Sequence, residues 1–540
     1  MKRVSADLWG AGPVVLFVLA FALVPVAVLF GQAITDAGGW RAIGSATLEP
    51  LDLASIENSL VQGGLSAAVA VALGYPAGIF FGRYSWPGRS LLRSFLIIPF
   101  LLPSLVVVFG ILDLFGPGGL ASTWIPGLSV LGTGLPAIVA ANLVFNVPIV
   151  VLFTATACES ASVELEETIA TLGGTPGRAY REVWGGPTWV GAAVGGMLTF
   201  LFSALSFAPP LLLCGPRCYT VEARIWSLDQ VFLDPTTAGV LAFVMVLLFL
   251  LPTVGYLWLL SRLRALPGRR EPTRRPVRRN DPLALALALE SIVVLAAVGL
   301  VLAGVLYRAL EPTGGAGAGG AYETLFSSAT TARLGISGLG MVANTLFFAT
   351  VAAMIAILLG IPAGYAIARR PRRTQGLGLF LFLPLLLSPV VLAFSLATFW
   401  RPLLGGESTI WFLVIVSQSI LAIPFALQSI EIPLAGLAPN VREAAETLGA
   451  TPWIAFLDAD VPRVRDGLTT AGLFAFALGL GEFTATYFLV TPRFTTIPVA
   501  LYRLSDARQF AVADAGAGLL LLLSLGVFLV LVLGGRRVEL

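Results

Sequence analysis

Long apolar stretches separated by short polar segments recur along the whole chain. Their lengths approach or exceed the run of about 20 apolar residues that an α-helix needs to cross the hydrocarbon core of a bilayer. The pattern predicts twelve membrane-spanning helices, six in each half, near residues 13–33, 57–82, 94–116, 135–158, 189–213 and 237–260, then 283–306, 340–368, 376–400, 410–432, 467–490 and 512–534. The expected fold is therefore an all-α integral membrane protein.

Composition supports this interpretation and excludes several classes of function. Of 540 residues, 57% are hydrophobic and only 12% are charged, whereas a soluble domain carries about 25% charge. Histidine is absent and the single lysine is Lys2, which excludes Ser-His-Asp catalysis and the lysine of a P-loop. The three cysteines, Cys158, Cys214 and Cys218, are too few for a four-cysteine metal centre. We therefore predict no enzyme activity, no catalytic residues, no metal and no cofactor, and a net charge of +3 gives no reason to expect nucleic acid as a partner.

Arginine placement predicts the orientation. Positive residues accumulate in cytoplasmic loops, and arginines follow the second, sixth, eighth and twelfth stretches: Arg83, Arg89 and Arg93; Arg262, Arg264, Arg269, Arg270, Arg274, Arg275, Arg278 and Arg279; Arg369, Arg370, Arg372 and Arg373; Arg536 and Arg537. These positions agree with a protein of the cell membrane whose two termini are cytoplasmic. The first stretch exceeds the about 7–15 residues of a signal-peptide core, so we expect it to remain as a span. The Arg- and Pro-rich segment 261–282 is interpreted as a solvated cytoplasmic linker.

The two halves resemble each other in sequence. Asn58-Ser59-Leu60 corresponds to Asn344-Thr345-Leu346 at an offset of 286, and Thr171-Leu172-Gly173 corresponds to Thr447-Leu448-Gly449 at an offset of 276. The change of ten fits a shorter external loop in the second half. Residues 1–260 and 283–540 are therefore predicted to form two parallel six-helix repeats joined by the linker 261–282, with the pathway between the repeats.

The most specific signal lies in the predicted cytoplasmic loop 434–466. Asn440 and Glu443 have the spacing of a helix-capping box. Gly449 is placed to end the same helix in a left-handed conformation, and Thr451-Pro452 begins another short segment. The pattern predicts a short rigid helix held between two membrane helices. Loop 159–188 carries a weaker copy from Glu164 to Gly173, followed by Pro176.

These loops resemble the EAA loop of the permease subunits of binding-protein-dependent ABC importers. Glu443, Ala444, Ala445 and Gly449 match the family pattern, with Pro452 after them, and Val461-Pro462 stands where the family has Leu-Pro. The degenerate copy keeps Glu167 and Gly173, but both alanines are replaced and Pro187 lies one residue late. The resemblance implies a type I importer permease fold in which two copies of a cytoplasmic ATPase subunit each receive one EAA helix. It also implies an extracytoplasmic solute-binding protein that delivers the solute, and the missing P-loop lysine agrees with that division of labour.

The solute stays open at the level of sequence. A single chain with both repeats resembles the fused permeases for thiamine, through Val144-Phe145-Asn146-Val147-Pro148 among other segments, and those for ferric iron, with phosphonate-type solutes as a further alternative. Charged residues within spans are candidates for the pathway, here Glu482 and Asp113, together with the amides Asn142 and Asn146. The alternative interpretation is structural. Glu482 would then bind a neighbouring helix or backbone, Asp113 would lie at the outer interface, and the amides would join helices.

Two further alternatives remain. An ion-coupled secondary transporter with parallel repeats would use Glu482 and Asp113 as its protonatable groups, but it would leave both EAA loops unexplained. Cys214 and Cys218 flank an external turn, Gly215-Pro216-Arg217, where an oxidising exterior permits a disulfide. Two unbonded side chains satisfy the sequence equally well, and Cys158 is expected to be a packing residue.

Overall fold

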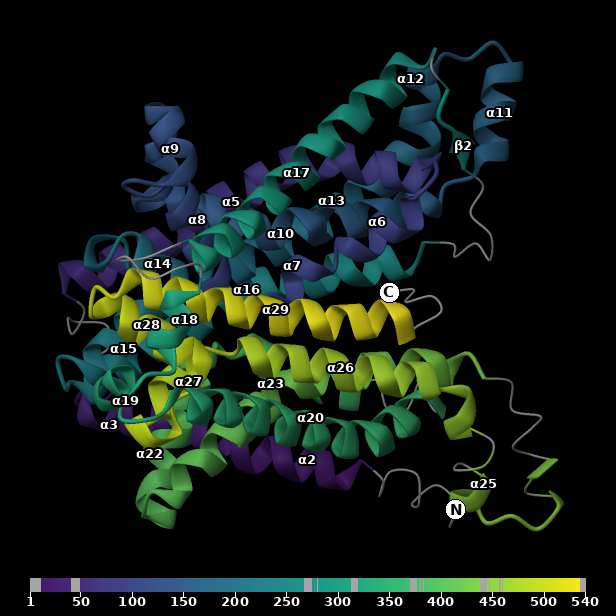
Figure 1. Cartoon of the computed structure of the whole chain (residues 1–540). Coiled ribbons are helices and arrows are strands. Elements are labelled where there is room, and N and C mark those ends of the chain that lie inside the picture. The colour runs from purple at the N-terminus through teal and green to yellow at the C-terminus, as the bar shows by residue number, and fades with distance from the viewer. Residues whose placement is uncertain are drawn as a thin grey trace. The chain divides into compact units, whose positions relative to one another are not determined.

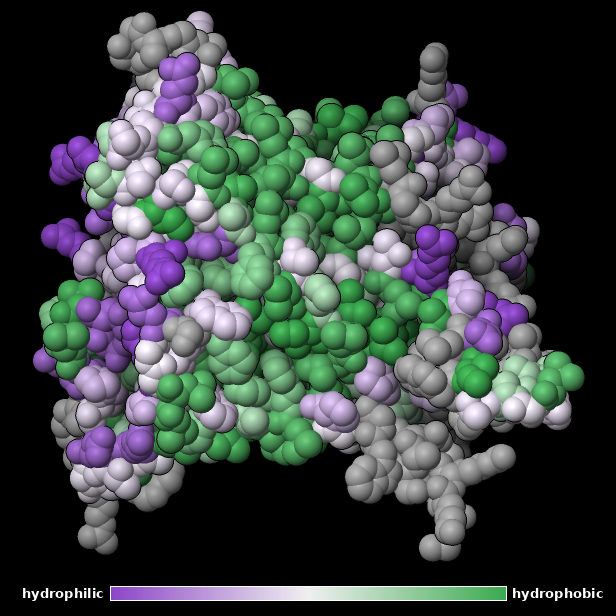
Figure 2. Space-filling model, turned by 60° about the horizontal axis from the view of Figure 1, so that its bottom comes forward, coloured by the Kyte–Doolittle hydropathy of each residue, from purple (hydrophilic) through white to green (hydrophobic). Residues whose placement is uncertain are grey.

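The computed structural model describes residues 11–39, 49–266, 274–278, 280–311, 319–369, 376–378, 380–381, 383–437, 444–445, 447–455, 458 and 460–534. Almost all regular structure in these residues is helical, and the strands are one parallel pair, β1 (Tyr84–Ser85) and β2 (Arg275–Pro276). On the face drawn in Figure 2, hydrophobic residues form a broad band and hydrophilic residues gather at its two margins. This distribution is the one expected of a protein that spans a membrane.

Ten helices among the described residues are long and apolar enough to cross a membrane, where the sequence predicted twelve. The ninth stretch forms a 16-residue helix, α22 (Pro389–Leu404), because Pro389 occupies its first turn and α22 cannot extend back through it. The eleventh forms a 17-residue helix, α26 (Arg465–Gly481), which ends where Glu482 leaves the helical conformation, and α27 (Thr484–Leu489) follows. Both segments are therefore shorter than the predicted spans.

The chain divides into two compact units that exchange their first spans. The first unit comprises Met1–Arg41, Leu101–Pro103 and Ala309–Leu540, and the second comprises Ala42–Phe100 and Ser104–Arg308. The N-terminal span thus packs with helices of the second sequence repeat: the Trp400 indole donates to the Ala20 carbonyl at 3.2 Å. The boundaries of the units differ from those of the sequence repeats for this reason.

The second unit contains most of the first repeat together with the first span of the second repeat (Figure 1). Its helices are α5 (Pro50–Arg83), α6 (Arg89–Phe95), α7 (Ile98–Leu101), α8 (Ser104–Phe115), α9 (Leu120–Trp124), η2 (Pro126–Gly132), α10 (Gly134–Glu159), α11 (Val163–Thr171), α12 (Pro176–Ala179), η3 (Tyr180–Trp184), α13 (Gly185–Ala204), α14 (Ala208–Leu213), η4 (Pro216–Cys218), α15 (Val221–Gln230), α16 (Pro235–Arg264) and α17 (Pro282–Leu310). α5 and α10 pack closely through small residues: a Cβ added at Gly78 would lie 2.4 Å from the Thr154 Cβ.

The first unit contains the N-terminal span and most of the second repeat. Its helices are α2 (Gly12–Val18), η1 (Leu19–Leu23), α3 (Val24–Asp36), α18 (Gly320–Leu325), α19 (Ser328–Leu334), α20 (Gly338–Arg369), η5 (Leu383–Leu386), α22, α23 (Ser408–Ala435), α25 (Pro452–Ala455), η7 (Val461–Arg463), α26, α27, η8 (Pro492–Phe494), α28 (Ile497–Asp506) and α29 (Phe510–Gly534). Phe21 of η1 lies against Trp400 of α22, with ring centroids 5.1 Å apart.

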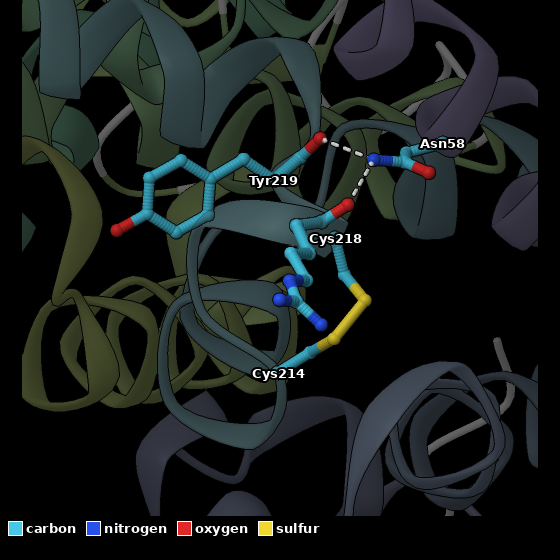
Figure 3. The surroundings of a disulfide bond; sticks show 5 residues. Asn58, Cys214, Cys218 and Tyr219 are labelled. Carbon is cyan, nitrogen blue, oxygen red and sulfur yellow. Dashed lines mark hydrogen bonds between the residues drawn. A yellow bond between two sulfur atoms is a disulfide. The ribbon is translucent and has the colours of Figure 1, made fainter. Parts of the chain in front are cut away.

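Equivalent residues of the two repeats make the same hydrogen bonds. The Asn58 amide donates to the carbonyls of Arg217 and Tyr219 at 3.1 and 3.2 Å (Figure 3). The Asn344 amide donates to the carbonyls of Arg493 and Thr495 at 3.2 and 3.1 Å. Both asparagines thus hold a turn that precedes a short helix, α15 in one repeat and α28 in the other.

The turn held by Asn58 also carries a disulfide between Cys214 and Cys218 (Figure 3). The sequence left a disulfide and two unbonded side chains as equal alternatives, and the structure has the bond. Cys158 is buried, as expected of a packing residue.

Candidate coupling and pathway sites

The first predicted coupling loop forms two short helices, α11 and α12. The Ser162 hydroxyl caps α11 by accepting from the Leu165 amide at 3.2 Å, and Pro176 begins α12 after an N-cap at Thr175. Both helices lie at the upper right of Figure 1, at the end of their unit opposite to α9. Loop 159–188 therefore contains short helices, as its sequence predicted.

α11 ends in a left-handed glycine with a specific set of hydrogen bonds. Gly173 has a φ of 76°, and the Gly174 amide donates to the Ile169 carbonyl at 2.8 Å while the Leu172 amide donates to the Thr168 carbonyl at 3.1 Å. The bond across five residues is the one that closes a helix C-terminus around a left-handed residue. Glycine is required here because a Cβ is disfavoured at positive φ.

The second predicted loop repeats these hydrogen bonds residue for residue. Gly449 has a φ of 92°, the Ala450 amide donates to the Ala445 carbonyl at 3.0 Å, and the Leu448 amide donates to the Ala444 carbonyl at 3.1 Å. Pro452 begins α25, the counterpart of α12. Asn440 and Glu443, which the sequence predicted to cap this helix, lie outside the described residues.

Both loops expose a leucine next to the left-handed glycine. Leu172 is 81% exposed and Leu448 is 90% exposed. An exposed leucine by itself is ordinary on a protein surface, but here the same turn of both repeats presents an exposed leucine. Neither leucine was among the predicted site residues, although both lie in the Thr-Leu-Gly sequence that the two repeats share.

The acidic residues of α11 divide into an exposed and a buried group. Glu167, which the sequence selected, is exposed. Its neighbour Glu166 is only 6% exposed, and its carboxylate binds Arg83 at the end of α5 and Arg275 of β2, the latter at 3.2 Å. Glu166 therefore fixes α11 to the membrane helix α5, a role that the sequence analysis missed.

A second carboxylate, that of Glu159, forms ion pairs with three arginines. Glu159, at the end of α10, binds Arg89 and Arg93 at 2.5 Å and Arg274 at 2.9 Å. Burial and the neighbouring Arg274 lower the pKa of Arg89, while Glu159 opposes the shift. Within the predicted linker 261–282, Arg274 and Arg275 form ion pairs with Glu159 and Glu166, and β2 pairs with β1.

The first-repeat pathway candidates are buried within their own unit. Asn142 donates to the Ser66 hydroxyl at 3.3 Å, and Asn146 donates to the Asn142 carbonyl at 2.8 Å and to the Ser203 hydroxyl at 3.2 Å. The Asn146 side-chain oxygen has no hydrogen-bond partner among the residues that the structure describes. Asp113 is 7% exposed and lies within α8.

Glu482 lies at the break between α26 and α27 and caps the second helix. Its two carboxylate oxygens accept from the Ala485 amide at 2.7 Å and the Thr486 amide at 2.8 Å, and the Thr486 hydroxyl also contacts the carboxylate. These contacts match the structural alternative of the sequence analysis, in which Glu482 binds backbone. Glu482 also lies at the break between two helices of its unit, and it stays a candidate for the pathway.

In the part of the chain that the structure describes, no group of three or more His, Cys, Asp or Glu is placed to hold a metal ion. The site residues make helix caps, ion pairs and interhelical hydrogen bonds, which position helices and carry no reaction.

The chain is similar to permeases of known transport systems. Residues 74–265 match the family described as binding-protein-dependent transport system inner membrane component. The thiamine transport system permease protein ThiP of Escherichia coli K12 is 26% identical over 478 residues, which cover 85% of this chain and 84% of ThiP.

Two shorter relatives match about a third of the chain each. The molybdenum transport system permease protein ModB of Azotobacter vinelandii is 30% identical over 202 residues, which are 35% of this chain and 88% of ModB. The putative 2-aminoethylphosphonate transport system permease protein PhnV of Salmonella typhimurium is 27% identical over 182 residues, which are 33% of this chain and 68% of PhnV.

Proposed function

Because the chain belongs to the family of binding-protein-dependent transport system inner membrane components, we propose that it carries thiamine through the membrane in an ATP-driven importer. It is the multi-pass, non-catalytic permease component of such a system, and ATP hydrolysis belongs to a separate partner. A binding protein that presents the solute is the other partner that this family implies.

The observation that carries the proposed mechanism is the identity of the two coupling turns. Leu172-Gly173 and Leu448-Gly449 end their helices with the same hydrogen bonds and expose the same side chain. Two equivalent contact points suit two copies of one ATPase subunit, because each copy then meets the same surface. Closure of the two ATPases would move both repeats together and change the side from which the pathway is open.

The arrangement of the chain in the membrane follows from this mechanism. In this proposal each of α11 and α25 faces the cytoplasm, and with twelve spans in two six-span repeats, 1–260 and 283–540, both termini are cytoplasmic. The arginines near this end, Arg89 and Arg93 among them, agree with the positive-inside rule.

Thiamine is supported by the extent of the similarity to ThiP, which includes both repeats. Thiamine is a cation, so a carboxylate or an amide oxygen that faces the pathway would favour it. Asp113, Glu482, Asn142 and Asn146 stay the candidates, and the buried Asn146 side-chain oxygen has no hydrogen-bond partner among the described residues. A phosphonate-type solute is the second candidate, supported by the similarity of about a third of the chain to PhnV.

The test is reconstitution of the permease with its ATPase and binding protein in liposomes. We expect ATP-dependent uptake of thiamine that requires all three components, and a purified binding protein that retains thiamine. Retention of 2-aminoethylphosphonate or another solute would overturn thiamine and leave the importer standing. Uptake driven by an ion gradient without the ATPase would overturn the importer and favour a secondary transporter.

A further inference from the structure

The hairpin formed by α9 and η2 is an addition found in only one repeat. Gly78 corresponds to Gly364 at an offset of 286, and Pro148 corresponds to Pro424 at an offset of 276, so the change falls in the segment that contains this hairpin. In the second repeat, α22 and α23 are joined by Gly405, Gly406 and Glu407 alone. The coupling turns are present in both repeats and the hairpin in one. The hairpin therefore has a role different from that of the coupling turns.

The hairpin is uncharged and exposes large apolar side chains at its tip. No charged residue occurs between Asp113 and Glu159. Trp124 is 87% exposed, Ile125 is 59% exposed and Val130 is 58% exposed. Exposing this apolar surface to water is unfavourable, and its transfer out of water would lower the free energy.

The hairpin is held in a defined position. The Ser122 hydroxyl donates to the carbonyls of Gly116 and Gly119 at 2.9 and 3.0 Å. A Cβ added at Gly132 would lie 2.1 Å from the Phe115 carbonyl oxygen, so η2 packs directly on the end of α8. Trp124 is therefore presented outward by a built element, and Figure 1 shows α9 standing out from α8.

The base of the hairpin is joined to α17, an apolar helix that is long enough to cross a membrane and is mostly exposed. α17 packs on α8, where a Cβ at Gly110 would lie 2.6 Å from the Val301 side chain, and Arg308 of α17 donates to the Gly118 carbonyl at 2.7 Å. Only 17% of the most apolar window of α17 is buried, and Tyr307 and Leu310 at its end are 55% and 57% exposed. The apolar tip therefore lies next to the end of α17, whose apolar surface is largely exposed.

We propose that the α9–η2 hairpin lies in the lipid headgroup region on the membrane side opposite to α11, with Trp124 and Ile125 inserted among the lipids. Tryptophan favours this depth because its ring is apolar and its N–H remains hydrogen-bonded. The absence of charge lets the whole tip enter the interface without desolvating an ion. The proposal depends on neither the solute nor the ATPase, so it can fail or hold independently of the function proposed above.

The test places a spin label on the full-length permease in lipid nanodiscs. Trp124→Cys reports on the tip, Val130→Cys is a second reporter, and Glu407→Cys is the matched control in the short charged loop of the other repeat. Labelling is selective because Cys214 and Cys218 are bonded and Cys158 is buried. Collisions with oxygen, which concentrates in lipid, are compared with collisions with a water-soluble nickel chelate.

We expect labels at 124 and 130 to collide with oxygen several-fold more often than with the chelate, and the label at 407 to show the reverse preference. Equal preference for the chelate at all three positions would overturn the proposal. It would also be overturned if the labels at 124 and 130 lost their contact with the chelate only after the solute-binding protein was added, because the tip would then be a protein-binding surface.

Discussion

Replacing Glu166 by glutamine tests how firmly the first coupling helix is fixed to the membrane domain. In the parent protein the Glu166 carboxylate joins α11 to Arg83 at the end of α5 and to Arg275 of β2. Glutamine keeps the size and a hydrogen-bonding oxygen but removes the charge. Arg83 then keeps its charge in a nearly buried position without its counterion.

The expected loss can be estimated from the exposure of the two partners. Removing one member of a buried ion pair costs about 3–5 kcal/mol, and we take the lower end because the Arg83 and Glu166 side chains are 11% and 8% exposed. The bond to Arg275 adds about 0–1 kcal/mol, because that arginine is 42% exposed. A loss of about 3 kcal/mol corresponds to an increase of about 100-fold in the local opening of α11.

Hydrogen–deuterium exchange of residues 163–172 measures that opening. Glu166→Gln should accelerate exchange of these amides, and Glu167→Gln is the matched control because it removes the same charge from an exposed position on the same helix. Adding Arg83→Gln to Glu166→Gln should restore part of the protection, since the uncompensated charge is gone. Equal exchange in the Glu166→Gln and Glu167→Gln proteins would refute the anchoring role.

Three further predictions concern the second coupling turn, the disulfide and Tyr84. Gly449→Ala should strain the second coupling turn by about 1 kcal/mol, because φ is 92° there; the added Cβ itself would meet no atom within 4 Å. The number of solute molecules transported per ATP hydrolysed should then fall, and an unchanged ratio would contradict the prediction. Replacing Cys214 and Cys218 by serine should lower unfolding stability by about 2 kcal/mol, since the bridge closes a separation of four residues; thermal unfolding of the parent protein with reductant should show the same loss. Burial and the neighbouring Asp281 raise the pKa of Tyr84 above its ordinary value of 10.0. The neutral Tyr84 hydroxyl therefore stabilises the folded state fully below pH 10.0, and this contribution is lost as the pH rises through the raised pKa. The melting temperature of the Tyr84→Phe protein should fall less over that range than that of the parent protein. An equal fall in both proteins would refute the assignment.

Local signals in the sequence identified the features that depend on one residue type. Gly173 and Gly449 could be predicted as helix ends because a left-handed turn needs glycine, and the apolar runs identified the long helices because a bilayer demands them. The alternative structural interpretation of Glu482 rested on the same kind of local reasoning, since a carboxylate next to a short helix can accept from its first amides.

Features that join distant segments could not be predicted in this way. The burial of Glu166 depends on Arg83 and Arg275, which lie far from it in the sequence, and nothing in the composition of α11 separates Glu166 from Glu167. Two of the twelve predicted stretches form shorter helices than expected, because apolar content was followed through positions such as Pro389, where the helix begins. The arginine-rich segment 261–282 was predicted to be a solvated linker from its Arg and Pro content, and its sequence does not reveal that Arg274 pairs with the distant Glu159.

The exchange of first spans between the two compact units has a consequence for biogenesis. The N-terminal span, residues 12–36, packs with helices that the ribosome completes only after more than half of the protein has been made. This span must therefore wait in the bilayer, stable as a helix but without its final neighbours. If the gene were cut within the linker, each product would lack a helix held by the other, so the two halves should accumulate only when they are expressed together.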